Sequence, residues 1–343
     1  MKKLLFFALT FVFMQSQAQH KDTLLITGVG DIMLGTMIPS NLYLPPNNDC
    51  SNELSKVKQI LMEADVAFCN LEGVLTDSKA GQKKCSKCYT FGMPTKYAQC
   101  LVDVGFDLIS TANNHASDFG AVGRQSTVKT LEKAGLHYAG FLSTPYTIFE
   151  KDSIKYGFCA FSPEGGNCSI NNIPEAQRIV RKLDSLCDVV IVSFHSGCEG
   201  KAFQHVPCTN EICFGYNRGN VCDFSHKVID AGADIVFGHG PHVTRAVELY
   251  KDRFIAYSMG NFCTYSSISI SGVNGLAPMF KIYTDRKGAF LKGEIVATYQ
   301  IKPQPVLIDE QKRVIKVIQD LTKADFPSSP LIISNDGLMT KKK

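Results

Sequence analysis

The chain has 343 residues, with 36 basic against 32 acidic side chains and a formal net charge of +4. Hydrophobic residues make up 45% of it and charged residues 20%, a balance that excludes a disordered or collagen-like chain. So small a net charge gives no indication of nucleic-acid binding. The length suits one large α/β domain or two smaller ones.

The amino terminus has the three parts of a signal peptide. Two lysines follow Met1, an apolar run covers residues 4–14, and Ala18 closes a small-x-small cleavage pattern. The run is too short to cross a bilayer, which takes about 20 apolar residues. The pattern predicts a signal peptide over residues 1–18 and export to the periplasm or the outside of the cell.

The next part of the chain alternates short apolar runs with amphipathic stretches. Strands are expected over 24–30, 66–69, 107–110, 136–139, 154–161, 189–194 and 235–237, and helices over 53–64, 94–104, 122–134, 174–186 and 224–231. Four strand-like runs then follow without helices between them, over 243–250, 254–259, 277–284 and 290–301. An alternating part before a strand-rich part predicts two sheets in one domain, over residues 19–322. Residues 323–343, which end in three lysines, are expected to form a loose tail.

Thirteen cysteines are many for a chain of this length, and an odd number cannot all pair within it. Export would permit disulfides. Eight cysteines lie in loop-like surroundings and are expected to pair: Cys50, Cys85, Cys88, Cys168, Cys198, Cys208, Cys213 and Cys222. Four lie in or beside apolar segments and are expected as buried thiols: Cys69, Cys100, Cys159 and Cys187.

Polar residues with metal-binding chemistry follow five of the expected strands, where α/β folds build their sites. They are Asp31, Glu72, the run Asn113-Asn114-His115, His195, and the pair His239 and His242. Imidazoles, carboxylates and an amide oxygen form a typical ligand set for a divalent metal. The dinucleotide-binding glycine pattern, the Walker loop and the G-x-S-x-G pattern do not occur.

Six motifs, in this order, resemble the poly-γ-glutamate capsule-synthesis (CapA-type) family of the calcineurin-like metallophosphoesterase superfamily. They are Gly30-Asp31-Ile32-Met33-Leu34-Gly35, Asn70-Leu71-Glu72-Gly73, Asn113-Asn114-His115 with Asp118 and Gly120, Phe194-His195-Ser196-Gly197, Gly238-His239-Gly240-Pro241-His242-Val243, and Ala256-Tyr257-Ser258-Met259-Gly260-Asn261-Phe262. The resemblance covers about residues 24–300. It implies a four-layer αββα sandwich of two mixed sheets with helices outside.

The resemblance also implies a centre for one or two divalent ions, such as Mn, Fe or Zn. Asp31 and His242 would hold the first ion, Glu72 would bridge, and Asn114, His195 and His239 would hold the second. His115 would be the catalytic imidazole, and Asp118, three residues on, would orient its ring and raise its pKa. Asp118 equally suits an acid in the first turn of a helix. Arg245 suits either a charge that binds substrate or a surface arginine. The chain departs from the superfamily at Met33, where a histidine ligand is usual.

These expectations describe an exported, phosphoesterase-like metal-dependent hydrolase of capsule, poly-γ-glutamate or cell-envelope metabolism. Its expected partners are an anionic polymer or phosphoester substrate and a capsule-synthesis membrane complex, but no nucleic acid. Two alternatives stay open: a non-catalytic, metal-containing accessory protein that binds an anionic capsule polymer, and a structural protein that keeps the core without metal. The cysteines between Gly197 and Asp223 predict a disulfide-stapled loop beside the centre, which would form part of the substrate rim.

Overall fold

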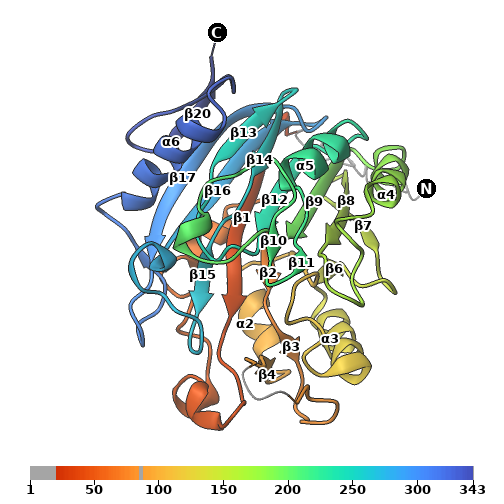
Figure 1. The fold of residues 1–343 in the computed structure, drawn as a ribbon, viewed down its shortest axis with the longest axis vertical. Helices are drawn as coiled ribbons and strands as arrows, with labels where there is room; N and C mark the ends of the chain where they lie inside the picture. Colours follow the sequence, from red (N-terminus) through yellow and green to blue (C-terminus); the bar gives the residue numbers. More distant parts are fainter. Residues whose placement is uncertain (1–20, 85–87, 343) are drawn as a thin grey trace, which may run out of the picture.

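The computed structural model describes residues 21–84 and 88–342 (Figure 1). The expected signal peptide, residues 1–18, and Cys85 lie outside the described residues. Two mixed β-sheets face each other in the described part, and helices cover their outer faces.

The first sheet has ten strands and is built around β1 (Thr23–Met33). On one side of β1 follow three parallel strands, β2 (Val66–Leu71), β5 (Leu108–Ser110) and β6 (His137–Ala139). On the other side follow antiparallel strands, β16 (Leu276–Asp285), β17 (Phe290–Tyr299), β20 (Leu338–Lys341) and β19 (Leu331–Ile333). β15 (Asn261–Thr264) pairs with the carboxyl end of β1, and β18 (Leu307–Ile308) pairs with β17.

The second sheet has six strands, in the order β13 (Val247–Tyr250), β14 (Arg253–Ala256), β12 (Ile235–His239), β9 (Val189–His195), β8 (Ile154–Phe161) and β7 (Tyr146–Lys151). The four inner strands are parallel, and the two edge strands are antiparallel to their neighbours. Two short pairs lie outside these sheets, β3 (Val74–Leu75) with β4 (Gly92–Met93) and β10 (Ile212–Cys213) with β11 (Tyr216–Asn217).

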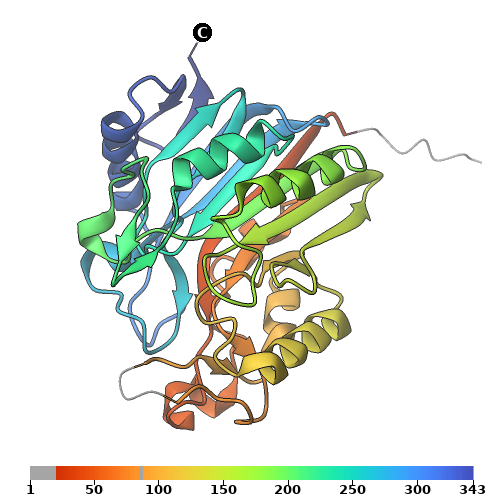
Figure 2. The ribbon, with the colours of Figure 1, turned by 45° about the vertical axis from the view of Figure 1, so that its right-hand side comes forward.

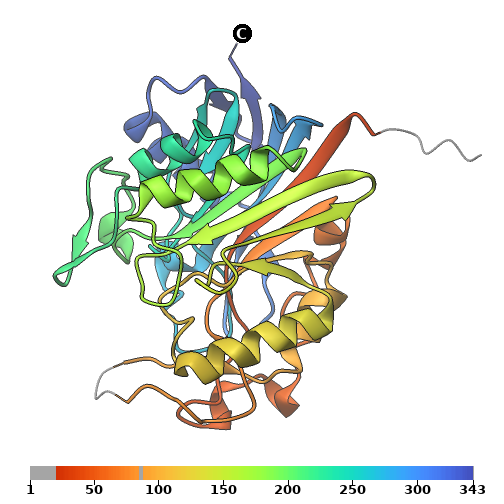
Figure 3. The same ribbon diagram turned by 90° about the vertical axis from the view of Figure 1, so that its right-hand side faces the viewer.

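Apolar side chains on both faces of the sheets hold four layers together. Leu24 and Ile26 of β1 join the core between the sheets, where Phe68 stacks on Phe237 with ring centroids 5.2 Å apart. The outer face of the first sheet packs on α1 (Lys58–Met62), α2 (Tyr97–Asp103) and α3 (Gly120–Ala134). The outer face of the second sheet packs on α4 (Ile173–Asp184) and α5 (Val221–Ile229), which lie side by side in Figure 2. Figure 3 shows α3 on the opposite side of the molecule from α4.

The predicted αββα sandwich is therefore confirmed. Because strands between two packed layers are buried on both faces, they read as continuous apolar runs, which is why their positions could be predicted. Four short 3-10 turns complete the described elements: η1 (Asn41–Tyr43), η2 (Pro46–Asn48), η3 (Lys201–Phe203) and η4 (Gly272–Gly275). Within the described residues, no helix combines the length and the apolar character that a membrane crossing requires.

The carboxyl-terminal segment corrects the prediction of a loose tail over 323–343. Helix α6 (Arg313–Asp325) contacts β13, β16 and β17 and so closes one edge between the sheets. Strands β19 and β20 then extend the first sheet, and Met339 is fully buried. The tail is part of the fold because its apolar residues fill this edge, although its strands are too short to show a period in the sequence.

The cysteines divide almost as predicted. Three disulfides are described, Cys50–Cys100, Cys198–Cys213 and Cys208–Cys222, and Cys88 is also disulfide-bonded. Cys69 and Cys159 are buried thiols, as expected, and Cys187 is a thiol that is only half-buried. Two expectations were wrong. Cys100 on α2 forms a disulfide with Cys50 of a preceding loop, and Cys168 is a buried thiol in the core on the outer face of the second sheet. A fifth thiol, Cys263, lies buried on β15.

Candidate metal centre

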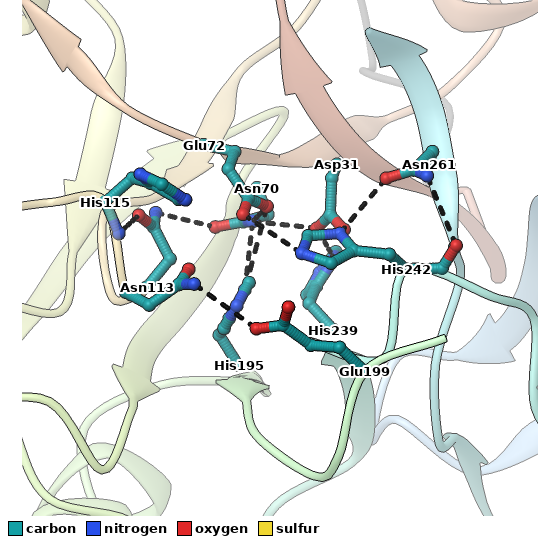
Figure 4. A network of polar contacts seen from close by, with 12 residues as sticks. Asp31, Asn70, Glu72, Asn113, His115, His195, Glu199, His239, His242 and Asn261 are labelled. Carbon is teal, nitrogen blue, oxygen red and sulfur yellow. Dashed lines mark hydrogen bonds and ion pairs between the residues drawn. The ribbon is translucent and has the colours of Figure 1, made fainter. Parts of the chain in front are cut away.

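The carboxyl ends of the central parallel strands of both sheets meet at one place. Asp31, near the end of β1, pairs in register with Asn70 of β2 and with Asn261 of β15. In the second sheet, His195 ends β9 and His239 ends β12, and the two are partners in register. Asp31, His195 and His239 meet at one point because each lies at or near the carboxyl end of a buried strand (Figure 4).

Two backbone features allow this close convergence. A side chain at Gly30 would collide with the carbonyl oxygen of Gly260, so only glycine fits there. His242 has a φ of 56°, in the left-handed region that costs a non-glycine residue energy. The side-chain amides of Asn261 and Asn274 donate to the His242 carbonyl, at 3.2 and 3.4 Å, and hold this conformation.

The Asp31 carboxylate lies at the centre of the cluster. Its Oδ1 is 3.0 Å from His239 Nδ1 and its Oδ2 is 3.0 Å from His242 Nδ1. Asn70 Nδ2 also donates to Oδ1, at 2.8 Å. Burial alone would raise the pKa of Asp31, but the hydrogen bonds with His239 and His242 hold it well below its usual range. Asp31 is therefore a fully buried anion, as a cation ligand should be.

Glu72 adds a second carboxylate beside the first. Burial, and then the negative charge of Asp31, raise the pKa of Glu72 well above its usual range. His242 Nε2 lies 3.5 Å from Glu72 Oε1. Burial would lower the pKa of His242, but Glu72 and Asp31 raise it to about 10. The pocket thus concentrates negative charge that a proton or a metal cation balances.

Four side-chain atoms of the predicted ligand set are buried and make no hydrogen bond. They are Glu72 Oε1, Asn114 Oδ1, His195 Nε2 and His239 Nε2. Leaving such an atom unpaired costs about 1–3 kcal/mol, so buried polar atoms nearly always have partners. One atom each from Glu72, His195 and His242 also lies within 4.8 Å of the other two. These unpaired oxygen and nitrogen atoms are of the kinds that bind divalent ions, so the chemistry of the set is compatible with such an ion.

The protonation of His195 agrees with such a role. Burial lowers the pKa of His195 well below its usual range, so the ring is neutral, as a metal-binding imidazole must be. Its Nδ1 lies 3.4 Å from Asn70 Nδ2.

Of the two neighbouring asparagines, only Asn114 keeps an unpaired oxygen. Asn113 Nδ2 donates to Asn70 Oδ1 at 3.1 Å and to the Leu71 carbonyl at 2.8 Å, and its Oδ1 accepts from the backbone of His115. Asn113 therefore positions the loop, and Asn114 is the residue available for an ion.

Met33, where the resemblance implies a histidine ligand, turns its side chain to the backbone. The buried thioether accepts a hydrogen bond from Gly35 N at 3.3 Å. Asn261 instead brings a hard oxygen to this side of the cluster, with Oδ1 3.1 Å from His242 Nδ1. Compared with the ligand set that the resemblance implies, the side of the cluster near His242 therefore has one imidazole fewer and one side-chain amide more.

The structure brings His115 and Asp118 together, with His115 Nδ1 2.8 Å from Asp118 Oδ2. Asp118 also pairs with Lys83 and accepts from Phe91 N, and the Phe91 ring stacks on His115 with centroids 4.0 Å apart. Burial lowers the pKa of His115, and Asp118 offsets only part of this change. Asp118 therefore acts on the pKa of His115 in the predicted direction, but burial outweighs it, and the pKa of His115 falls below its usual value. Asp118 also lies before α3, which begins at Gly120, and not in its first turn.

Arg245 is neither a surface residue nor a charge offered to a ligand. The side chain is fully buried, and its guanidinium donates to Glu211 Oε1 at 2.8 Å and to Oε2 at 2.7 Å. Glu211 also accepts from the backbone of Cys198 at 3.0 Å. Both interpretations of Arg245 are thus corrected, because the Glu211 carboxylate already satisfies this charge inside the protein.

The predicted stapled loop, residues 197–223, does border the cluster, and we call it the insertion. Cys198–Cys213 and Cys208–Cys222 close it. Its Glu199 accepts from Asn114 Nδ2 at 3.4 Å, so the insertion reaches a predicted ligand.

Several residues of the site were not singled out from the sequence. Asn70 and Asn261 belong to motifs that carried the family resemblance, and their place beside Asp31 could have been inferred from strand register. Glu199 lies in the cysteine-rich insertion, where no periodic pattern marks it.

The model of the family described as bacterial capsule synthesis protein PGA_cap matches residues 25–266. Capsule biosynthesis protein CapA of Bacillus anthracis is 27% identical over 266 residues, which are 71% of this chain and 60% of that protein. PGA biosynthesis protein CapA of Bacillus subtilis (strain 168) is 25% identical over 346 residues, which are 92% of this chain and 84% of that protein. The chain thus spans less than two thirds of the Bacillus anthracis relative but most of the Bacillus subtilis one.

More distant similarities extend to other proteins. A Mycobacterium tuberculosis protein (strain CDC 1551 / Oshkosh), named as a probable polyglutamine synthesis accessory protein, is 27% identical over 228 residues, 57% of this chain and 55% of that protein. A hypothetical protein from Thermus thermophilus superposes with a TM-score of 0.49 and 15% identity, covering 81% of this chain and all of that one. A 5'-nucleotidase precursor from the same organism superposes with a TM-score of 0.46 and 11% identity, covering 88% of this chain and 59% of that one.

Proposed function

The chain belongs to the bacterial capsule synthesis protein PGA_cap family, and from that premise we propose that it is an exported metal-dependent hydrolase. Its proposed substrate is a phosphoester or amide-linked anionic polymer of capsule, poly-γ-glutamate or cell-envelope metabolism. One observation supports the metal most strongly: four predicted ligand residues keep buried side-chain atoms without hydrogen bonds around the Asp31 carboxylate.

Bound divalent ions would supply Lewis-acid stabilisation and a water activated for attack. The ions would be held by the predicted ligand set, Asp31, Glu72, Asn114, His195, His239 and His242, with Asn261 beside His242. The other steps fall to residues outside this set.

His115 is the proposed proton carrier. Asp118 faces Nδ1 and fixes the ring, which leaves Nε2 to exchange a proton with the substrate. Because burial lowers its pKa, the ring is neutral at pH 7. It would take up a proton from solvent at Nε2 and give it to the leaving oxygen or nitrogen, while the attacking water would release its proton to solvent, so that no net proton is gained or lost. The stacked Phe91 ring keeps water from one face of the imidazole.

The test compares wild type with His115→Ala and Asp31→Ala on phosphomonoesters, phosphodiesters and poly-γ-glutamate, with added Mn²⁺. We expect His115→Ala to keep its metal and lose about 10²–10⁴-fold in turnover, the usual contribution of a general acid–base group. Asp31→Ala should lose both metal and turnover. His226→Asn, on α5 outside the site, is the matched control and should retain both. A wild type that binds metal and turns over nothing on this panel would refute the hydrolase.

The second candidate function is a non-catalytic accessory protein that binds an anionic capsule polymer through its metal. Met33 favours it, because a thioether bound to the backbone stands where the resemblance implies a histidine ligand. The name of the Mycobacterium tuberculosis relative, an accessory protein of polyglutamine synthesis, points the same way. Metal binding without turnover, together with polymer binding, would support this function. A wild type without bound metal would support a purely structural core.

We propose export on the strength of the disulfides, which form and persist in oxidising compartments. A capsule-synthesis membrane complex is the proposed partner. The amino-terminal sequence of the protein recovered from the periplasm tests export, since cleavage after Ala18 leaves Gln19 as the first residue.

A further inference from the structure

We propose that Arg218 of the insertion is an anion-binding residue of the site, and that the Glu199 carboxylate occupies the place a substrate oxyanion takes. The ligand class is a carboxylate or a phosphoryl group next to the reacting bond. The inference rests on the proposed function only in taking this ligand to be the substrate of the metal centre.

Arg218 is a buried cation with one nitrogen left unsatisfied. Its side chain is 9% exposed. Nε donates to the Gly197 carbonyl at 3.0 Å, and one terminal nitrogen donates to Glu164 at 3.0 Å. The other terminal nitrogen is buried and makes no hydrogen bond, and the Glu199 carboxylate lies 3.6 Å from it. A buried charged donor that makes no hydrogen bond, and only a long ion pair, is costly, so it indicates a site for a ligand.

The unsatisfied nitrogen lies next to the metal centre. The same Glu199 oxygen, Oε1, that is 3.6 Å from Arg218 accepts from Asn114 Nδ2 at 3.4 Å. Asn114 is a predicted metal ligand. An oxyanion in the place of this carboxylate would therefore contact Arg218 while the rest of the ligand reaches the centre.

Glu199 is a weakly held occupant. Both of its contacts are longer than the 2.7–2.9 Å of a good charge-assisted hydrogen bond, and its side chain is 46% exposed. It can therefore turn to solvent at little cost. Since Glu199 is itself a carboxylate, its position between Arg218 and Asn114 shows the charge and size of group that fits there.

Arg218, in contrast, is held rigidly. Its backbone N donates to the Glu211 carbonyl at 2.7 Å, and its own carbonyl accepts from Gly197 N at 3.2 Å. The disulfide Cys198–Cys213 closes the loop beside Glu199. A preorganised guanidinium loses little entropy on binding and suits the planar fork geometry of carboxylate or phosphate oxygens.

The experiment measures binding of inorganic phosphate and of a γ-linked oligoglutamate to the full chain by calorimetry, with and without Mn²⁺. We expect Arg218→Met to weaken binding at least tenfold and Arg218→Lys to weaken it less. Glu199→Gln removes the competing carboxylate, so it should tighten binding several-fold. Arg178→Met, an exposed arginine of α4, is the control and should match wild type.

The two ligands distinguish the source of the oxyanion. If Arg218→Met weakens the binding of phosphate alone, the oxyanion is a phosphoryl group. If it weakens the binding of oligoglutamate alone, the oxyanion is a carboxylate. Equal affinities of wild type and Arg218→Met, or no binding of either ligand by wild type, would overturn the inference. If Arg218→Met does not fold, Glu199→Gln decides, since unchanged or weaker binding by that variant also overturns it. Failure of Mn²⁺ to bind, with phosphate binding still dependent on Arg218, would instead refute the metal centre and leave the anion subsite standing.

Discussion

The buried pair of Arg245 and Glu211 gives the sharpest stability prediction. The guanidinium is fully buried and donates to both carboxylate oxygens, at 2.8 and 2.7 Å, while Glu211 also holds the backbone of Cys198. In Arg245→Met the carboxylate would remain in the interior without its counter-charge. Breaking a buried pair in this way costs about 3–5 kcal/mol, mostly because one charge is left uncompensated. We expect the free energy of unfolding to fall by that amount.

Urea unfolding of Arg245→Met, Glu211→Gln and the double variant Arg245→Met/Glu211→Leu tests the reasoning. The double variant removes both charges. Its loss of unfolding free energy should therefore be smaller, by about 2 kcal/mol or more, than the sum of the losses in the two single variants. The affinities of folded Arg245→Met for phosphate and oligoglutamate test the alternative, that Arg245 binds substrate. Unchanged stability together with weakened anion binding would refute the anchor and restore Arg245 as a substrate-binding residue.

Three further variants test other parts of the structure. Burial raises the pKa of Glu53 from 4.5 to about 7. Wild type should therefore lose stability as the pH rises through this window, whereas Glu53→Gln should not. In urea unfolding, the free energy of the variant should gain about 1–2 kcal/mol relative to wild type between about pH 5 and about pH 8, and a difference that stays constant with pH would contradict the shift. Removing the Cys50–Cys100 disulfide, whose cysteines are 50 residues apart, with Cys50→Ser/Cys100→Ser should cost about 2–4 kcal/mol of unfolding free energy but leave Mn²⁺ affinity unchanged. Asn261→Ala removes the amide that holds His242 in its left-handed conformation, so Mn²⁺ affinity should fall about 10–100-fold by calorimetry, and unaltered affinity would deny Asn261 that role.

The sequence predicted those parts of the site that depend on single strands. His195 and His239 each end a continuous apolar run, Asp31 lies near the end of another, and such runs mark strands buried on both faces. Because parallel strand ends meet at one edge, their convergence followed from the pattern.

The features that depend on contacts between distant segments could not be predicted. Arg245 is buried only because Glu211 of the insertion folds back over it, and Cys100 pairs only because a loop 50 residues earlier lies beneath α2. The low pKa of His115 likewise depends on burial, which the spacing to Asp118 does not show. In each case the partner is far along the chain, and no local pattern identifies it.

The metal content of the full chain tests the central claim most directly. After dialysis against Mn²⁺, Fe²⁺ or Zn²⁺ and removal of excess, elemental analysis should find one or two ions per chain in wild type and fewer in Glu72→Gln and His195→Ala. Bound metal should also raise the unfolding free energy, by about 2.7 kcal/mol at a free concentration 100 times Kd. A wild type that binds no stoichiometric ion and gains no stability from any of the three metals would contradict the assignment of the Asp31 cluster as a metal centre.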